Sequence, residues 1–335
     1  MKALYFVAPR EVEIREEPLP EMGLGQLAVQ TLVSAISPGT EMLVFRGEMP
    51  QNEKTDATIA ALTGEFRYPL KYGYASVGRV MAVGQPDLAW WKDRLVFSFQ
   101  PHQTHFLATP AQLFPLPDGI TPEQAVFLPN METAVNFVMD GRPLIGERIA
   151  VFGQGIVGLL TTALLAQFPL ANLTTFDYLS LRRNASFEAG AHSSVSPDFL
   201  HIAKSSYDFP SPPFDLTYEL TGSPEALNDA IAVTGFDGRV VIGSWYGQKR
   251  APIDLGGYFH RARIQLIGSQ VSTLAPQFSG RWDKARRFEV AWEMIRRVKP
   301  EKWITHRFPF ARATEAFEQV DQPTDAIQVI LTYEG

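Results

Sequence analysis

Three glycines lie at the junction of two apolar segments, and this junction constrains the fold more than any other feature of the chain. The segment 153–158 reads Gly-Gln-Gly-Ile-Val-Gly, directly after the apolar run Arg148–Phe152 and directly before a second apolar run of helical length. In such a strand–turn–helix unit, Gly153 permits the tight turn, Gly155 lets the backbone approach a pyrophosphate, and Gly158 lets helix and strand pack closely. The residues predicted to contact a dinucleotide in this turn are Gly153, Gly155, Ile156, Val157 and Gly158.

An acidic residue follows the turn at the interval expected for a group that binds the adenosine ribose. Asp177 ends the next predicted strand, 19 residues after Gly158, and the usual interval is about 20 residues. A carboxylate there accepts hydrogen bonds from the ribose hydroxyls and repels a 2′-phosphate, which favours NAD as the cofactor. Arg182 and Arg183 follow soon after and offer partners for that phosphate, so NADP stays an alternative.

The chain alternates between predicted strands and helices from about residue 123 onward. This order implies an α/β domain with a doubly wound parallel sheet and helices on both faces. Two of the strands lead into small residues, at Gly222 and Gly243, which leave room for a nicotinamide ring beyond the carboxyl ends of the strands. The predicted elements are a helix at 122–138, a strand at 148–152, a helix up to 168, a strand at 173–176, a helix at 179–189, a strand at 215–220, a helix at 224–233, a strand at 239–243 and a helix at 283–298.

The first 120 or so residues have a different pattern, with short strands separated by proline and glycine. Strands without long intervening helices indicate an antiparallel, barrel-like domain, and the polar segment 51–66 is interpreted as a surface excursion without chemistry. We expect one domain at 1–122, completed by the tail 300–335, and a dinucleotide-binding domain at 123–299. The predicted strands outside the second domain are 3–7, 26–33, 75–83, 94–99, 303–306 and 327–331.

Composition narrows the class of ligand. The 335 residues include 45% hydrophobic and 20% charged residues, and the net charge of −6 gives no electrostatic footprint for nucleic acid or anionic lipid. The chain has no cysteine, which excludes disulfides, thiolate nucleophiles and cysteine-ligated zinc. The N-terminus does not read as a signal peptide, and no apolar run reaches the ~20 residues that cross a bilayer. We therefore expect a cytoplasmic protein with a small-molecule substrate and neither a nucleic-acid nor a membrane partner.

The chain resembles the medium-chain dehydrogenase/reductase superfamily, which includes the zinc alcohol dehydrogenases and the quinone oxidoreductases. The resemblance covers nearly the whole length. It implies a GroES-like, β-rich catalytic domain, formed by the N-terminal part and the C-terminal tail, and a Rossmann domain, and it implies that Thr133 lies near the nicotinamide. The stretches that carry the resemblance are VSAISPGT (33–40), GYASVGRV (73–80), LPDG (116–119), ETA (132–134), the glycine-rich turn and ATEAF (313–317).

The positions that carry zinc ligands in the zinc-dependent members of this superfamily hold other residues here. Ser37 stands where the pattern Gly-Ile-Cys-Gly carries its cysteine, and Gly73-Tyr74-Ala75 stands where Gly-His-Glu carries histidine and glutamate. The third ligand position falls near Pro129, and the four-cysteine lobe that holds structural zinc is missing. A hydroxyl and a phenol do not replace thiolate and imidazole as zinc donors at neutral pH. The resemblance therefore implies zinc-independent chemistry with no bound metal.

Hydride transfer without a Lewis acid still needs a group that stabilises the developing oxyanion and moves a proton. Tyr74 is a candidate donor through its phenol. Ser37 and Thr40 are candidates to bind the substrate oxygen or to pass a proton outward. The alternative for Tyr74 is that it only fills the space left by metal and ligands, with its hydroxyl satisfied locally.

Two histidines and one glutamate are further candidates. His102 and His105 are three residues apart on a predicted strand or loop, where side chains at this spacing point to different faces, so a shared metal is not expected. A substrate-side role for either histidine stays open. Glu41 is a candidate base, with a structurally paired carboxylate as the alternative.

Three functions remain open at this point. The leading one is a zinc-independent, NAD(P)-dependent oxidoreductase that acts on an alcohol/ketone pair. The second is an NADPH-dependent reductase of the C=C bond of a quinone or enone, and the third is a nucleotide-binding protein that has lost catalysis. The segments 37–41 and 99–103 also resemble the bacteriochlorophyllide hydroxyethyl dehydrogenases of this superfamily, which favours a large hydrophobic substrate. A homodimer is expected, with 239–246 as a candidate surface.

Overall fold

The computed structural model describes the chain except for residues 51–54, 56–58, 60, 63, 204–212, 323–324 and 335 and the side chains of 201–203. Much of the surface excursion predicted at 51–66 therefore lies outside the described residues. The chain divides into two compact units. Unit 1 comprises Met1–Pro129 and Lys299–Gly335, and unit 2 comprises Asn130–Val298. No helix of the described residues is both long enough and apolar enough to cross a bilayer.

Unit 2 is built on a six-stranded sheet in which all neighbouring strands are parallel. Its strands are β8 (Arg148–Phe152), β9 (Asn172–Phe176), β10 (Ser193–Val195), β11 (Phe214–Glu219), β12 (Thr234–Ile242) and β13 (Gln265–Gly268). Their order is β10-β9-β8-β11-β12-β13. The chain leaves β8 first toward one edge and later toward the other, which makes the β8–β11 boundary the switch point where such sheets bind ligands. The predicted doubly wound parallel sheet is confirmed.

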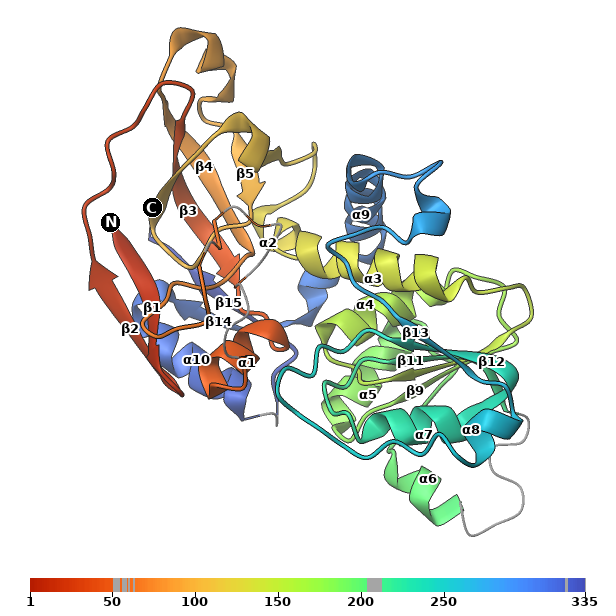
Figure 1. Cartoon of the computed structure of the whole chain (residues 1–335). Helices are drawn as coiled ribbons and strands as arrows, with labels where there is room; N and C mark the ends of the chain where they lie inside the picture. Colours follow the sequence, from red (N-terminus) through yellow and green to blue (C-terminus); the bar gives the residue numbers. More distant parts are fainter. Residues whose placement is uncertain are drawn as a thin grey trace. The chain divides into compact units, whose positions relative to one another are not determined.

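Helices cover both faces of this sheet. They are α3 (Leu128–Gly141), α4 (Ile156–Leu165), α5 (Ser180–Glu188), α6 (Asp198–Ala203), α7 (Ala226–Val233), α8 (Tyr258–Arg261) and α9 (Lys284–Val298). Along β8, Ile149 and Val151 pack in a cluster with side chains of α3 and α4, whereas Ala150 and Phe152 pack in a cluster with side chains of α7. This alternation is what a strand buried on both faces requires. Figure 1 shows α3 and α4 on one side of the strands and α7 and α8 on the other.

Some details of this part of the chain differ from the sequence prediction. The helix predicted at 122–138 is two helices, α2 (Pro122–Ala125) and α3. Pro129 lies in the first turn of α3, where its missing N–H is harmless, whereas its ring would disrupt one continuous helix. The short elements β10, α6 and β13 were not predicted. The segment 239–242, proposed as dimer surface, lies in β12, which has β11 and β13 as neighbours on its two sides, so its backbone is not available for pairing with a second copy.

Unit 1 contains a seven-stranded, mainly antiparallel sheet and a separate two-stranded ladder, β1-β2. The strands of unit 1 are β1 (Lys2–Ala8), β2 (Glu11–Glu16), β3 (Leu27–Ala35), β4 (Ser76–Val83), β5 (Leu95–Ser98), β6 (His105–Ala108), β7 (Phe114–Pro115), β14 (Ile304–Pro309) and β15 (Gln328–Thr332). The larger sheet has the order β14-β15-β3-β4-β5-β7, and β6 also pairs with β3. Because β15 is antiparallel to β3, the C-terminal tail and the N-terminal strands share one sheet.

Two helices complete the core of unit 1, α1 (Thr40–Arg46) and α10 (Ala313–Asp321). The ring of Phe317 on α10 lies 5.2 Å from that of Phe6 and 5.5 Å from that of Phe45. The short 3-10 helices are η1 (Pro86–Trp91), η2 (Pro110–Gln112), η3 (Pro276–Phe278) in unit 2, η4 (Pro300–Trp303) and η5 (Phe310–Arg312). The packing of Phe45 and Phe317 fixes α1 and therefore the segment Ser37–Glu41 at its start.

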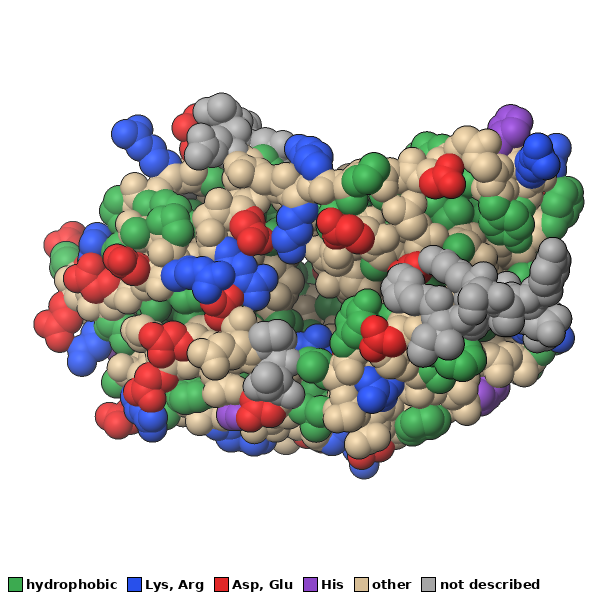
Figure 2. Space-filling model, turned by 90° about the horizontal axis from the view of Figure 1, so that it is seen from below, with side chains coloured by type: hydrophobic (Ala, Val, Ile, Leu, Met, Phe, Trp, Pro, Cys, Tyr) green, Lys and Arg blue, Asp and Glu red, His purple; other side chains and the backbone are tan. Residues whose placement is uncertain are grey.

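Charged side chains of both signs are mixed on the surface. Figure 2 shows one face of the molecule, on which Lys and Arg side chains lie among Asp and Glu side chains. With a net charge of −6, the described residues of this face form no extended basic surface of the kind that binds a phosphate backbone.

Candidate functional site

The glycine-rich turn of unit 2 is shaped by close backbone contacts. Gly153 has a φ of +86°, and a Cβ there would lie 2.6 Å from the carbonyl oxygen of Leu220. A Cβ on Gly158 would overlap the carbonyl oxygen of Gly153. The fold itself therefore requires both glycines, the first for a backbone conformation that L residues rarely adopt and the second for the close approach of α4 to the end of β8.

Gly155 differs from Gly153 and Gly158 because no steric contact in the described structure requires a glycine there. Its φ of −66° is open to any residue, and a Cβ would meet no heavy atom within 4 Å. Gly155 is the N-cap of α4, and the N–H groups of the first turn, including those of Ile156 and Val157, have no acceptor within the helix. Open space above the N-terminus of a ten-residue helix suits the phosphates of a nucleotide.

Asp177 follows β9 directly, and backbone donors bind both of its carboxylate oxygens. Oδ2 accepts from the Gln154 N–H at 2.8 Å, and Oδ1 accepts from the Leu179 N–H at 2.9 Å. The Nη1 atom of Arg182 lies 4.0 Å from Oδ2, whereas Arg183 donates to the backbone carbonyl oxygens of residues 177 and 178. The structure thus brings Asp177 and Arg182 to the glycine-rich turn, and it uses Arg183 in local backbone contacts.

The loops after β11 and β12 meet at the same end of the sheet. Gly222 has a φ of +74° and donates its N–H to Ser244 Oγ at 2.9 Å. Gly243 packs so closely on Phe137 and Leu220 that a Cβ would overlap both side chains. Both predicted glycines therefore lie at the carboxyl edge of the sheet. The positive φ of Gly222 and the close packing around Gly243 each favour glycine without a ligand.

Sequence reasoning missed a buried carboxylate at this edge. Glu219 ends β11 and is fully buried; it accepts hydrogen bonds from the N–H and the hydroxyl of Thr221 at 2.8 and 2.5 Å and from the phenol of Tyr246 at 2.5 Å. Burial and the negative charge of Glu219 raise the pKa of Tyr246, so the phenol keeps its proton and remains the donor. The two residues are 27 positions apart, and no local pattern predicts their pairing.

A buried ionic cluster lies along α3, next to Thr133. Glu132, Asn136 and Asp140 are spaced by four residues and therefore share one face of the helix. Arg287 of α9 binds Glu132, with 2.7 Å between Nη2 and Oε1. Burial raises the pKa values of Glu132 and Asp140, and the positive charge of Arg287 opposes both shifts. The spacing of polar residues in an otherwise apolar helix is the signal that could have revealed this cluster.

In unit 1 the structure brings Ser37 and Tyr74 together. The Tyr74 phenol donates to Ser37 Oγ at 2.6 Å, and the Ser37 N–H donates to Glu41 Oε1 at 3.1 Å. Ser37 is 8% exposed, and Thr40 is the half-buried first residue of α1. A phenol and a hydroxyl therefore form a hydrogen-bonded pair at the two positions that the resemblance matches to zinc ligands.

Glu41 and His102, treated separately in the sequence, form one buried pair. Glu41 Oε2 lies 2.8 Å from His102 Nε2, and both side chains are fully buried. His102 Nδ1 lies 2.7 Å from Ser34 Oγ, which lies 2.8 Å from the hydroxyl of Tyr333. A Cβ on Gly73 would lie 2.8 Å from the His102 ring. The glycine before Tyr74 therefore makes room for this histidine, and Glu41 is a structurally paired carboxylate.

The donor set at the zinc-ligand positions does not fit a zinc ion. Ser37 and Tyr74 offer a hydroxyl and a phenol that bind each other, and Pro129 offers no side-chain donor, whereas protein zinc sites use thiolate, imidazole and carboxylate. His102 and His105 have different partners, because Nδ1 of His105 lies 3.1 Å from the hydroxyl of Thr104 next to it. Among the residues that the structure describes, no group of three or more His, Cys, Asp or Glu side chains is placed to hold a metal.

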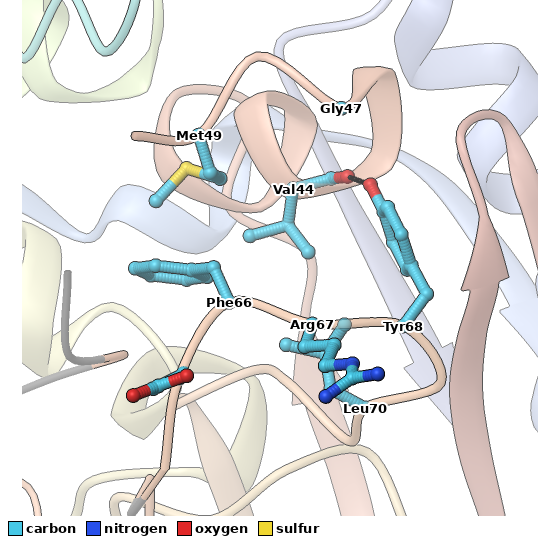
Figure 3. A pocket seen from close by; sticks show the side chains of 8 residues that line it. Val44, Gly47, Met49, Phe66, Arg67, Tyr68 and Leu70 are labelled. Carbon is cyan, nitrogen blue, oxygen red and sulfur yellow. Dashed lines mark hydrogen bonds between the residues drawn. The ribbon is translucent and has the colours of Figure 1, made fainter. Parts of the chain in front are cut away.

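Unit 1 also contains a pocket of about 520 Å³. Its lining residues are Val44, Gly47, Met49, Glu65, Phe66, Arg67, Tyr68 and Leu70. Figure 3 shows Val44, Met49 and Phe66 around its apolar part, with the Tyr68 hydroxyl bound to the Val44 carbonyl oxygen. The Phe66 ring lies 5.8 Å from that of Tyr72, which lies 6.4 Å from that of Tyr74. The pocket thus borders the aromatic cluster that contains Tyr74, but none of the three predicted catalytic residues lines it.

Comparison with curated proteins finds dehydrogenases. An alcohol dehydrogenase of Cupriavidus necator is 28% identical over 198 residues, and the match spans 49% of this chain and about half, 54%, of that relative. The starvation-sensing protein RspB of Escherichia coli is 20% identical, and the match covers 99% of both chains. No family model matches the chain.

Solved structures share the fold over the whole length. The alcohol dehydrogenase RspB from E. coli, solved in complex with NADH, has a TM-score of 0.77 and 17% identity, with 99% of both chains covered. The 2R,3R-butanediol dehydrogenase of Bacillus subtilis has a TM-score of 0.76 and 18% identity, again with 99% of both chains covered. The chain is thus similar in sequence to a curated alcohol dehydrogenase and shares its fold with solved dehydrogenase structures, in agreement with its motifs.

Proposed function

We propose that the chain is an NAD(P)-dependent oxidoreductase that transfers a hydride between the nicotinamide and an alcohol/ketone pair, without zinc. The observation that carries the proposal is the open space at Gly155, a glycine that no contact in the described structure requires. The relative named alcohol dehydrogenase and the NADH complex of RspB support the same reaction class. We further propose that the protein acts in the cytoplasm. We also propose that it is a homo-oligomer, a dimer, and sedimentation analysis tests this oligomeric state.

Unit 2 would hold the cofactor. The helix N-terminus at Ile156 and Val157 would bind the pyrophosphate, and Asp177 would accept hydrogen bonds from the adenosine ribose. The bound nicotinamide supplies or accepts the hydride. The residues proposed for cofactor binding are Thr133, Gly153, Gly155, Ile156, Val157, Gly158, Asp177, Arg182, Gly222 and Gly243.

Unit 1 would supply the proton chemistry. Negative charge develops on the carbonyl oxygen during reduction, and a hydroxyl donor aimed at that oxygen stabilises it. Because the Tyr74 phenol donates to Ser37 Oγ, the Ser37 hydroxyl proton points elsewhere and is available to a substrate oxygen. Thr40, at the start of α1, offers a second hydroxyl for passing the proton outward. We propose that the catalytic domain comprises 1–122 and 300–335 and the cofactor domain 123–299, bounds that differ by a few residues from those of the two units.

Asp177 is expected to set the preference for NADH over NADPH. Asp177→Asn removes the charge that repels a 2′-phosphate and leaves the side-chain size unchanged, so the ratio of the two dissociation constants should shift toward NADPH by about tenfold. Fluorescence titration with each nucleotide measures this ratio. The matched control is Asp215→Asn, because Asp215 binds the Arg148 N–H at the amino ends of β8 and β11. An unchanged ratio in Asp177→Asn would show that this carboxylate does not face the ribose.

Activity is expected to be independent of zinc. Since Ser37 and Tyr74 are poor zinc donors and already bind each other, protein from zinc-supplemented cultures should contain zinc far below one ion per chain. Dialysis against EDTA should leave turnover unchanged. Elemental analysis and turnover of the same sample measure both quantities. One zinc per chain together with loss of activity in EDTA would contradict the zinc-free chemistry. It would not contradict the proposed oxidation of alcohols and reduction of ketones.

Turnover with a panel of substrates tests the reaction class. We expect oxidation of secondary alcohols with NAD or NADP and reduction of the matching ketones. Activity restricted to enones or quinones with NADPH would show instead that the chain reduces C=C bonds. Tight nucleotide binding without any turnover would show a protein that has lost catalysis.

A further inference from the structure

Arg287 on α9 is fully buried, and each of its five N–H groups has an acceptor. Nε and Nη2 donate to Glu132 Oε1 at 3.1 and 2.7 Å, and Nη1 donates to Asn136 Oδ1 at 2.6 Å. Nη1 also donates to the Thr273 carbonyl oxygen at 3.3 Å, and Nη2 donates to the Val271 carbonyl oxygen. The guanidinium is a rigid fork of five donors, so this set of bonds fixes α3, α9 and the loop with Val271 and Thr273 in one geometry.

The other end of the same cluster binds the first residue after β13. Ser269 donates to Asp140 Oδ2 at 2.5 Å and accepts from Asn136 Nδ2 at 3.0 Å. Asn136 Nδ2 also donates to Asp140 Oδ2 at 3.0 Å. One buried cluster therefore fixes the segment 269–273 from both ends.

This segment lies on the half of the sheet opposite to Asp177. Asp177 follows β9 on one side of β8, whereas β11, β12 and β13 lie in that order on the other side. A dinucleotide with its pyrophosphate on the β8–α4 turn and its adenosine ribose at Asp177 extends its nicotinamide half over the carboxyl ends of β11 to β13. The segment 269–273 begins directly at that edge.

We infer that Arg287 and Glu132 are positioning residues for the nicotinamide half of the dinucleotide. They fix the segment 269–273, which would contact that half. The inference rests on the proposed function. Neither side chain needs to touch the ligand. A buried ion pair is poor evidence of stabilisation, because apolar replacements of both partners are often neutral or stabilising. Apolar side chains at these positions cannot bind the carbonyl oxygens of Val271 and Thr273, so they would not hold the segment 269–273 in place as Arg287 does.

The double variant Glu132→Met/Arg287→Met tests the inference because it removes both charges and leaves no unpaired buried ion. We expect its dissociation constant for NADH to rise about tenfold or more, and that for ADP-ribose, which lacks the nicotinamide, to stay within about twofold of wild type. Arg287→Lys is the second variant, since it keeps the charge and loses the planar fork. It should show the same selective weakening to a smaller extent, as measured by calorimetric titration of both ligands.

The control is the exposed pair Glu293 and Arg297 on the same helix, joined at 2.8 Å. Glu293→Met/Arg297→Met should leave the affinities for both ligands unchanged. Equal weakening for NADH and ADP-ribose, or no change for either, in both Arg287 variants would overturn the inference while the proposed function stands. Wild-type protein that binds neither ligand would overturn the proposed function together with the inference.

Discussion

Replacing Gly155 by valine is expected to lower the affinity for NADH by about 100-fold or more, with little effect on the stability of the free protein. The added side chain would enter the open space above α4, where a Cβ meets no protein atom within 4 Å, and would exclude the pyrophosphate. Valine is a poorer N-cap than glycine by up to about 1 kcal/mol, which shifts the melting temperature by no more than about 4 °C for a domain of this size. Calorimetric titration and thermal denaturation measure the two effects separately.

Gly158→Ala is the matched control for this prediction. Its Cβ would overlap the Gly153 carbonyl oxygen, which is backbone and has little room to move, so the free energy of unfolding should fall by about 1–3 kcal/mol. The pair thus separates a glycine kept for a ligand from a glycine kept for the fold. A Gly155→Val variant that binds NADH as tightly as wild type would contradict the assignment of the open space to a phosphate.

The second large effect is expected for Tyr74→Phe, which removes one hydroxyl and keeps the ring. Loss of the phenol that orients Ser37 should lower kcat by about 100-fold, the lower range for a positioned proton donor, with a smaller change in KM. Steady-state kinetics on a substrate that the wild type turns over measures both constants. Stability should change little, because phenylalanine fills the same volume.

Tyr72→Phe is the control for Tyr74. Tyr72 is a buried tyrosine whose ring lies 6.4 Å from that of Tyr74, so the same chemical change is made two residues away. We expect its kcat to stay close to wild type. If Tyr74→Phe also kept the wild-type kcat, Tyr74 would be a space-filling residue and catalysis would not depend on its hydrogen bond to Ser37.

The sequence predicted those parts of the structure that depend on local patterns. The turn at Gly153–Gly158 follows an apolar strand and opens an apolar helix, and the alternation of strands and helices after it sufficed for the parallel sheet. The single helix predicted at 122–138 was wrong because helical periodicity continues across Pro129, although a proline there starts a new helix. The strand β13, four residues ending in Gly268, is too short to produce a pattern.

The buried ionic pairs could not be predicted because their partners are distant in the chain. Glu41 and His102 are 61 positions apart, and Glu132 and Arg287 are 155 positions apart. The polar spacing in α3 indicates a buried cluster on that helix, but a single sequence does not show which distant residue completes each pair. Tertiary packing removes both partners from water, and only then does each need the other.

The central claim is that the glycine-rich turn of unit 2 binds a pyridine dinucleotide. Calorimetric titration of the folded wild-type protein with NADH, with Gly155→Val in parallel, tests it most directly. The account predicts saturable binding of one NADH per chain to the wild type and loss of that binding in the variant. Folded wild-type protein that binds neither NADH nor NADPH would contradict it.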